Sequence, residues 1–322
     1  MMPYHSIYAP ILNQYIAFKR SYGLKFKMEY ALKELDDFFF VTGASTIGVT
    51  REQAELWGKQ RPNEADSNLS QRIQHLNGFA RYLNDVGYPS FVPQPIKFHS
   101  TFIPRILTHE EIARLFKASD DRSSRKGTGI SSSHILLFPI TIRLLYATGM
   151  RAGELVRLTV GDVNLQDGTI LIRESKNGRD RLVPVSDSML AILRGYSVRH
   201  NVGANATMPF FRRRDGKPCS RNSLYVLFRE CIELAGIHHE GRGKGPRMHD
   251  VRHTAAVHSM AAMADAGLDL YYGLPLLSKY LGHCSLKSTE TYVRLSEEMF
   301  PGVLTEANSI APSVFPEVNH AQ

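Results

Sequence analysis

Apolar positions recur at helical spacing through the first part of the chain. Two stretches, 6–22 and 28–41, are predicted to be amphipathic helices because one face of each would be apolar. In the first stretch the apolar positions are Ile7, Ile11, Tyr15 and Phe18. The chain therefore opens with a helical region that can bury its own core.

Local start and stop signals divide the rest of this helical region. Thr50 is suited to an N-cap, and Gln53 three positions later completes a capping box for a third helix. A fourth helix is predicted over 67–86, and Gly87 ends it. Four prolines then fall within 89–104. Because proline interrupts helices, this stretch is predicted to be a linker.

A second region begins with ILTHEEIARLF, where Thr108 and Glu111 form another capping box ahead of an apolar-periodic helix. Residues 119–133 are rich in serine, glycine and charged residues, and they are predicted to form a polar loop. The apolar stretch 134–149 is predicted to be a buried helix.

The hydrophobic period then changes from helical to alternating. The stretch DVNLQDGTILIRESKNGRDRLVPV carries Asp-Gly and Asn-Gly pairs, which favour tight turns. It is predicted to be a small antiparallel sheet with Lys176 and Asn177 at a hairpin tip. From Ser186 onward the pattern is helical again, interrupted by a basic loop at 201–221.

These elements predict a two-domain protein that is mainly α-helical with a small antiparallel β-sheet. We expect a helical domain over 1–88, a linker over 89–104, an α+β domain over 105–300 and a tail over 301–322.

Cysteine usage and apolar runs narrow the class of protein. Cys219, Cys231 and Cys284 make an odd count without paired spacing, which argues against a disulfide framework and for a reducing compartment. The N-terminus lacks a basic segment followed by an apolar core, and the most apolar run, 135–150, is interrupted by a proline and an arginine. We therefore expect a cytoplasmic protein without a membrane span.

The net charge of +8 is concentrated in one segment. Residues 171–221 hold 11 Lys and Arg against 4 Asp and Glu. Such an excess favours a polyanionic partner, although a solvated basic face is the ordinary alternative. The candidate phosphate contacts are Arg173, Arg179, Arg181, Arg212, Arg213, Arg214, Lys217 and Arg221.

Four separate stretches place a cation or a proton carrier at the edge of a predicted element. Taken singly, each has an ordinary explanation, such as a surface ion pair, a solvated turn or a helix cap. Their order and local contexts are together far more specific. The residues are, in chain order, Arg151 with Glu154 nearby, Lys176, His249, Arg252, His283 and Tyr292.

This set resembles the tyrosine recombinases of the phage integrase family. That family's pattern is Arg, Lys, His-x-x-Arg, His or Trp, and Tyr, and the stretches here read TGMRAGEL, ESKNGRD, HDVRHT and LGHCSLKSTETY. The resemblance covers about residues 104–300, and more loosely the helical domain before them. It implies a clamp around DNA, made of a core-binding domain over 1–88 and a catalytic domain over 105–300. Strands would be cleaved and rejoined through a 3′-phosphotyrosyl intermediate and a Holliday junction.

The resemblance implies that Arg151, Arg252 and His283 bind the phosphate. Two guanidiniums offer forked donors that match phosphate oxygens and stay protonated. They can hold the charge that builds up on a pentacoordinate phosphorus. Glu154 is the expected partner that orients Arg151.

The remaining residues carry protons and the covalent bond. Tyr292 would be the nucleophile and His249 the base that takes its proton. By resemblance, Lys176 would donate a proton to the leaving 5′-oxygen. Small rotations of the helix around Tyr292 would gate cleavage.

The resemblance also implies the partners. We expect double-stranded DNA recombination sites, a homotetramer on DNA, sister recombinases as an option, and a bacterial, nucleoid-associated location, with no cofactor and no metal. The spacer 253–282 is longer than in compact family members and is similar to that of transposon-borne ones. The tail 301–322 would dock on a neighbouring protomer, and a frayed terminus is the alternative.

Three rival functions stay open. His249 and His253 have the i, i+4 spacing of two metal ligands, as in a metallohydrolase, but no third ligand follows. A type IB topoisomerase would use similar chemistry and rejoin the same strand. A non-catalytic DNA-binding regulator would share the basic segment.

Overall fold

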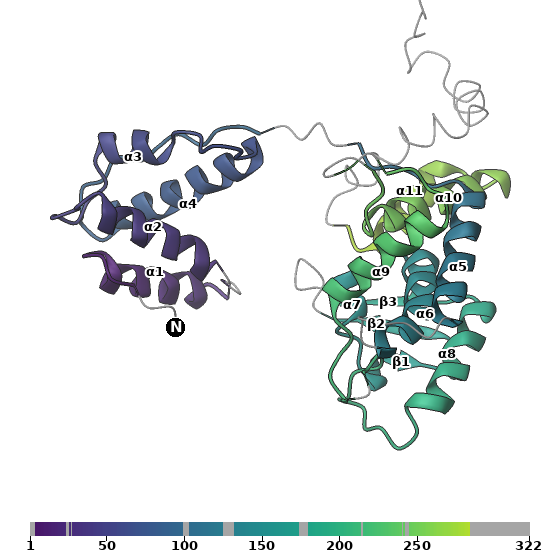
Figure 1. The fold of residues 1–322 in the computed structure, drawn as a ribbon. Coiled ribbons are helices and arrows are strands. Elements are labelled where there is room, and N and C mark those ends of the chain that lie inside the picture. The colour runs from purple at the N-terminus through teal and green to yellow at the C-terminus, as the bar shows by residue number, and fades with distance from the viewer. Residues whose placement is uncertain are drawn as a thin grey trace, which may run out of the picture. The chain divides into compact units, whose positions relative to one another are not determined.

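The structure is a computed structural model in which the chain forms two units. It describes residues 4–23, 26, 28–98, 103–124, 132–173, 180–213, 215–239, 241 and 245–283. The contacts divide the chain into Met1–Phe102, here the N-terminal unit, and Ile103–Gln322, here the C-terminal unit. Figure 1 shows helices in both units and a small sheet in the second.

The described part of the N-terminal unit is helical, as predicted. Its helices are α1 (Ala9–Ser21), α2 (Glu29–Val41), α3 (Arg51–Trp57) and α4 (Asp66–Asp85). Their apolar faces meet in an aromatic core, where Tyr8 stacks on Phe39 with ring centroids 4.1 Å apart and Phe79 is fully buried. Thr50 and Gln53 form the reciprocal capping box expected at the start of α3.

A buried ion pair ties α4 to the end of α3. Arg72 lies 2.9 Å from Glu64, and both side chains are less than a tenth exposed. The same guanidinium donates to the backbone carbonyls of Trp57 and Lys59, the latter at 2.9 Å. These carbonyls at the end of a short helix would otherwise lack partners.

Residues 88–98, all described, contain no helix or strand and run back along α4. The hydroxyl of Ser70 donates to the carbonyl of Ile96 at 2.8 Å, and the amide of Asn77 donates to the carbonyl of Pro93 at 2.7 Å. The first part of the expected linker is therefore bound to the N-terminal unit.

The C-terminal unit is built around α6, which contacts α5, α8, α9 and α10 (Figure 1). Within the described part of the chain, no helix combines the length and apolar character that a membrane span needs. The helices are α5 (His109–Ser124), α6 (Ser132–Thr148), α7 (Ala152–Leu155), α8 (Asp187–His200), α9 (Arg221–Leu234), α10 (Asp250–Asp265) and α11 (Leu270–Leu281). A 3-10 turn, Val160–Asp162, precedes the sheet.

The sheet has the antiparallel order β1-β2-β3 that the alternating pattern predicted. Its strands are β1 (Val163–Asn164), β2 (Thr169–Ile172) and β3 (Arg181–Pro184). Ile170 pairs with Val183, and Ile172 pairs with Arg181. Because the three apolar residues are buried, Arg181 lies on the face of the sheet that covers the core.

The prediction of a polar loop over 119–133 is wrong at its start, because α5 continues to Ser124. Ser119 is 1% exposed, and its hydroxyl donates to a helix carbonyl 2.7 Å away. Arg143 of α6 binds both oxygens of Asp120, at 2.9 and 2.7 Å. One contact within the helix and one between helices thus satisfy polar residues that favour a loop by composition alone.

Candidate active site

Arg151 lies at the junction between α6 and α7 and is the N-cap residue of α7. Its backbone N–H donates to Oε2 of Glu154 at 2.9 Å, and its Nη1 donates to Oε1 at 2.8 Å. The side chain of Glu154 is 2% exposed, whereas that of Arg151 is 26% exposed. A buried carboxylate therefore fixes the backbone and the guanidinium of Arg151 and leaves part of the side chain accessible.

Glu154 also binds Arg181. Nη2 of Arg181 lies 2.8 Å from Oε2, and Nη1 lies 3.2 Å from Oε1. Burial alone would raise the pKa of Glu154, but hydrogen bonds from Arg181 and Arg151 and the charge of Arg181 lower it to about 2. Glu154 is therefore ionised at neutral pH, which suits its expected role as the partner of Arg151.

Arg252 lies in the first turn of α10 and is 3% exposed. Its Nη1 donates to the backbone carbonyl of Gly149 at 2.6 Å, and its Nη2 donates to that of Leu281 at 2.8 Å. Gly149 directly follows α6, and Leu281 is the last residue of α11. One guanidinium thus joins the ends of two helices to the start of a third.

Three histidines accompany the arginines. The rings of His249 and His253 are nearly perpendicular, with centroids 4.8 Å apart. Burial, followed by the charges of Arg252 and Arg151, lowers the pKa values of His249 and His283 to about 4. Burial and neighbouring positive groups lower the pKa of His253 to about 3. All three rings are therefore neutral at pH 7. The charge of Arg252 acts on all three rings and that of Arg151 acts on His249 and His283, so these groups lie near one another.

His283 is held by the turn that ends α11. Its backbone N–H donates to the carbonyl of Ser278 at 2.9 Å. Gly282 before it has a left-handed φ of +72°, and a Cβ on Gly282 would lie 2.8 Å from Nη1 of Arg181. This turn therefore requires glycine both for its conformation and for the space it leaves.

The structure brings together five of the predicted site residues: Arg151, Glu154, His249, Arg252 and His283. Lys176 and Tyr292, the expected acid and nucleophile, lie outside the described residues, so their roles stay predictions. Also outside are Arg179, Arg214 and the tail 301–322.

Besides Arg181, two of the candidate phosphate contacts are paired with carboxylates. Arg173 lies 2.6 Å from Asp162, and Arg213 lies 2.6 Å from Asp215. The side chain of Arg173 is 58% exposed, so it stays accessible to solvent. These pairs reduce the positive charge that the segment presents locally.

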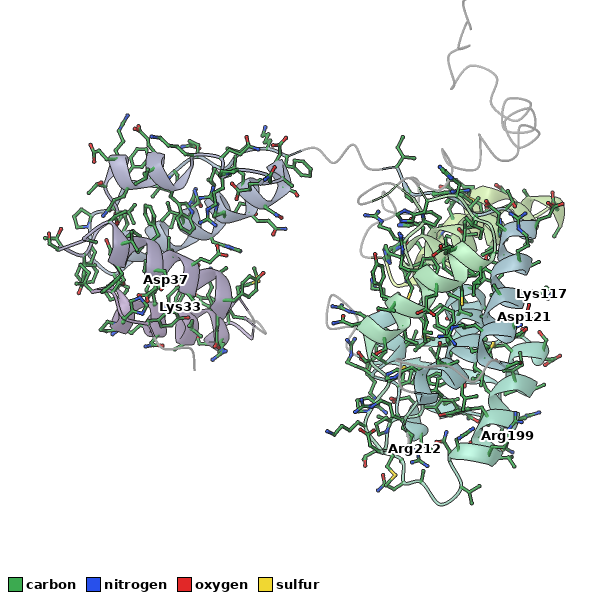
Figure 2. The ribbon with its side chains drawn as sticks, viewed as in Figure 1. Lys33, Asp37, Lys117, Asp121, Arg199 and Arg212 are labelled. Atoms are coloured by element: carbon green, nitrogen blue, oxygen red, sulfur yellow. The ribbon has the colours of Figure 1, made fainter. Side chains whose placement is uncertain are left out.

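The other described candidates, Arg212, Lys217 and Arg221, lie on or just after a short hairpin in which Arg212 pairs with Pro218. Figure 2 shows Arg212, with Arg199, at the end of the C-terminal unit away from α10 and α11. Arg212 also donates to the backbone carbonyl of His200. Lys217 and Arg221 are exposed. The structure does not bring these residues to the cluster around Arg151.

Two members of the cluster have other roles in the sequence analysis: Arg181 as a phosphate contact and His253 as a possible metal ligand. Arg181 was assigned to the DNA-contacting segment, yet its side chain is 9% exposed and bound to Glu154. Its position two residues before Val183, on one face of an alternating strand, was a signal that it points toward the core.

A metal site on α10 would need a third ligand beside the paired histidines. Among the described residues, one group of three side chains has metal-ligating distances, and it lies elsewhere: His5, Asp36 and Asp37. The ammonium of Lys33 lies 2.9 Å from Nδ1 of His5 and 3.5 Å from Asp36. This group therefore already has a cation beside it.

The sequence matches one protein family and is similar to several known proteins. The profile of the phage integrase family matches residues 105–299. The protein y4rB of Sinorhizobium fredii is 30% identical over 312 residues, which are 91% of this chain and 95% of that protein. The tyrosine recombinase XerA of Pyrococcus furiosus is 26% identical over 206 residues, 64% of this chain and 63% of that protein.

Solved structures share the fold at low identity. The XerH site-specific recombinase bound to palindromic difH substrate has a TM-score of 0.60 at 20% identity, over 87% of this chain and 77% of that chain. The Tn1549 transposon integrase in complex with transposon right end DNA has a TM-score of 0.59 at 17% identity, over 89% of this chain and 98% of that chain. The family match and the near full-length relative agree with this fold, and the chain therefore belongs to the phage integrase family of tyrosine recombinases.

Proposed function

We propose that the cluster binds one DNA phosphodiester and that Tyr292 attacks it. The observation that carries this proposal is the pair of guanidiniums, Arg151 and Arg252, each held by hydrogen bonds within the C-terminal unit. The charges of both lower the pKa values of His249 and His283. A guanidinium presents a planar fork of donors that suits phosphate oxygens and does not lose its proton.

Fixed positive charge suits this reaction because the attack adds negative charge to the equatorial oxygens of phosphorus. Donors already held in place stabilise that charge without reorganising during the step. Arg151 and Arg252 would supply two such donors. His283, neutral because its pKa is lowered to about 4, would donate one N–H to a non-bridging oxygen.

The reaction also needs a base for the attacking phenol and an acid for the leaving oxygen. The phenol of Tyr292 has an ordinary pKa of about 10 and needs a base at neutral pH. His249, with its pKa lowered to about 4 by burial and by Arg252, would be unprotonated and would accept that proton as the phenol oxygen bonds to phosphorus. Lys176 would protonate the leaving 5′-oxygen. The 3′-phosphotyrosyl bond conserves the energy of the broken bond, so a 5′-hydroxyl of another strand can reverse the step.

On this basis the protein exchanges strands between two double-stranded DNA sites. A lambda integrase tetramer has been solved bound to a Holliday junction, and we propose a homotetramer on DNA for this chain as well. The N-terminal unit and the exposed basic residues would contact backbone phosphates, which position the protein without reading sequence. The setting we propose is the nucleoid in the bacterial cytoplasm.

Covalent trapping tests the proposal. The full chain is incubated with a pool of randomised nicked duplexes, denatured in SDS, and the DNA that remains attached to protein is recovered and sequenced. Tyr292→Phe is compared with a control variant, Tyr225→Phe, which changes a tyrosine on α9 that is 46% exposed. Each reaction is repeated with EDTA.

We expect adducts with the wild type and with Tyr225→Phe, and none with Tyr292→Phe. EDTA should leave the yield unchanged. Adducts that persist in Tyr292→Phe would show that another residue is the nucleophile. Adducts lost on chelation would show that a metal takes part in cleavage.

A further inference from the structure

Arg181 is the first residue of β3 and lies on the buried face of the sheet. It pairs across the strands with Ile172, which is 1% exposed, and it shares its face with the fully buried Val183. The side chain of Arg181 is 9% exposed. A guanidinium in this position needs partners within the protein, because an unpaired buried charge is strongly unfavourable.

All three nitrogens of the Arg181 guanidinium have such partners. Nη1 and Nη2 bind the carboxylate of Glu154, and Nε donates to the backbone carbonyl of Tyr280 at 3.0 Å. That carbonyl belongs to the last turn of α11, where carbonyls lack partners within the helix. The guanidinium therefore joins the carboxylate that holds Arg151 to the helix end that carries His283.

Arg181 also packs closely against the turn before His283. A Cβ added to Gly282 would lie 2.8 Å from Nη1 and 3.0 Å from Cδ of Arg181. The side chain thus rests against the backbone of Gly282, one residue before His283. Removing it would leave a space into which the end of α11 can move.

We propose that Arg181 is a positioning residue that sets the relative placement of Arg151 and His283 and does not itself contact the DNA. The inference rests on the proposed function, because those two groups are the ones assigned to the scissile phosphate. It departs from the sequence-based assignment of Arg181 as a phosphate contact. A displacement of about 1 Å at a preorganised site can slow a reaction by about 100-fold.

The geometry also predicts that lysine is a poor substitute. The fork of Arg181 reaches a carboxylate and a carbonyl on two different elements at once. An ammonium is a point charge on a flexible stem and would keep the attraction to Glu154 while losing the fixed span to Tyr280. Arg181→Lys should therefore fold but cleave DNA more slowly than the wild type.

The test compares Arg181→Met and Arg181→Lys with Arg143→Met. Arg143 on α6 is a matched control, because it forms a bidentate ion pair with Asp120 on α5. Neither of these two hydrogen bonds involves a residue of the cluster. Each full-length variant is checked for folding by circular dichroism. The rate of covalent adduct formation and the salt dependence of binding are then measured on the pool of randomised nicked duplexes.

We expect Arg181→Met and Arg181→Lys to slow adduct formation by about 10- to 100-fold per folded molecule. Binding affinity and the slope of its salt dependence should stay at the wild-type values, and Arg143→Met should cleave at the wild-type rate. In a Glu154→Gln background, Arg181→Met should slow cleavage by a smaller factor than it does in the wild type, because the two residues act through one contact.

Two results would overturn the proposal. A weaker affinity with a salt slope reduced by about 1 would make Arg181 a phosphate contact. A wild-type cleavage rate in folded Arg181→Lys and Arg181→Met would make it a fold-stabilising residue only. If the wild type forms no adduct, or Tyr292→Phe still forms one, it is the proposed function that fails.

Discussion

The backbone carbonyl oxygen of Gly149 lies 2.6 Å from Nη1 of Arg252, a residue 103 positions further along the chain. Gly149 has a left-handed φ of +58°, and a Cβ on it would lie 2.5 Å from Cδ2 of Leu281. Leu281 supplies the other carbonyl that binds Arg252. The backbone at Gly149 therefore fixes the guanidinium and also sets how closely α11 can approach it.

Gly149→Ala should lower both stability and cleavage. A left-handed alanine costs about 1–2 kcal/mol, and the clash with Leu281 should add about 1–3 kcal/mol. Gly203→Ala is the control, because its φ is +69° with nothing within 4 Å of the added Cβ. Urea unfolding and adduct formation measure the two effects. Equal stability of the two variants would show that the clash is relieved at no cost.

Arg252→Lys should slow covalent adduct formation by about 100- to 1,000-fold, the range seen when a single oxyanion donor is removed. A lysine cannot span the carbonyls of Gly149 and Leu281 together, so the charge would lose its fixed direction. Arg143→Lys serves as the comparison. A folded Arg252→Lys protein that cleaves at the wild-type rate would contradict the role given to the Arg252 fork.

The histidine cluster should make the C-terminal unit lose stability in mild acid. The pKa values of His249, His253 and His283 are lowered in the folded state, so the unfolded chain binds more protons as the pH falls. The contribution of these rings to the free energy of unfolding is complete above about pH 6.5, the pKa of an unperturbed histidine. It is lost as the pH falls toward the pKa values of the folded state, about 4 and about 3.

Urea midpoints measured by circular dichroism between about pH 7.5 and about pH 4.5 check this. Because the three rings interact, the pH dependence of the midpoint belongs to the group and not to any one histidine. His249→Gln should flatten the profile. A midpoint that is constant over this range, or that rises on acidification, would contradict the lowered pKa values.

Arg72→Met should destabilise the N-terminal unit by about 3–5 kcal/mol, because it leaves Glu64 buried without its partner. Trp57 is the only tryptophan of the chain, and Arg72 lies over its ring at 4.9 Å. Its fluorescence therefore reports this unit specifically. Arg51→Met, which removes an exposed cation over the ring of Phe91, is the comparison. An unchanged urea midpoint of the Trp57 signal would show that the pair is not stabilising.

The elements with local signals were predictable. The capping boxes of Thr50 with Gln53 and of Thr108 with Glu111 are both present, because each involves residues only three positions apart. The alternation between residues 162 and 185 likewise gave the antiparallel sheet, since strand faces follow a period of two.

The contacts that assemble the site were not predictable in the same way. Arg252 binds backbone carbonyls, which every residue has, so no side chain at 149 or 281 marks its partner. Arg181 lies 27 positions from Glu154 and reaches it only after β3 has paired with β2. A basic segment looks uniform along the sequence, and burial is what separates Arg181 from exposed Arg173.

The carbonyl of Leu281 has a consequence for the chain during its synthesis. Arg252 obtains its second anchor only when the end of α11 is in place. A chain whose synthesis has not yet passed Leu281, or a fragment cut before it, holds a complete N-terminal unit but lacks the second anchor of Arg252. Under the proposed function, such fragments should bind DNA without cleaving it, because they also lack Tyr292.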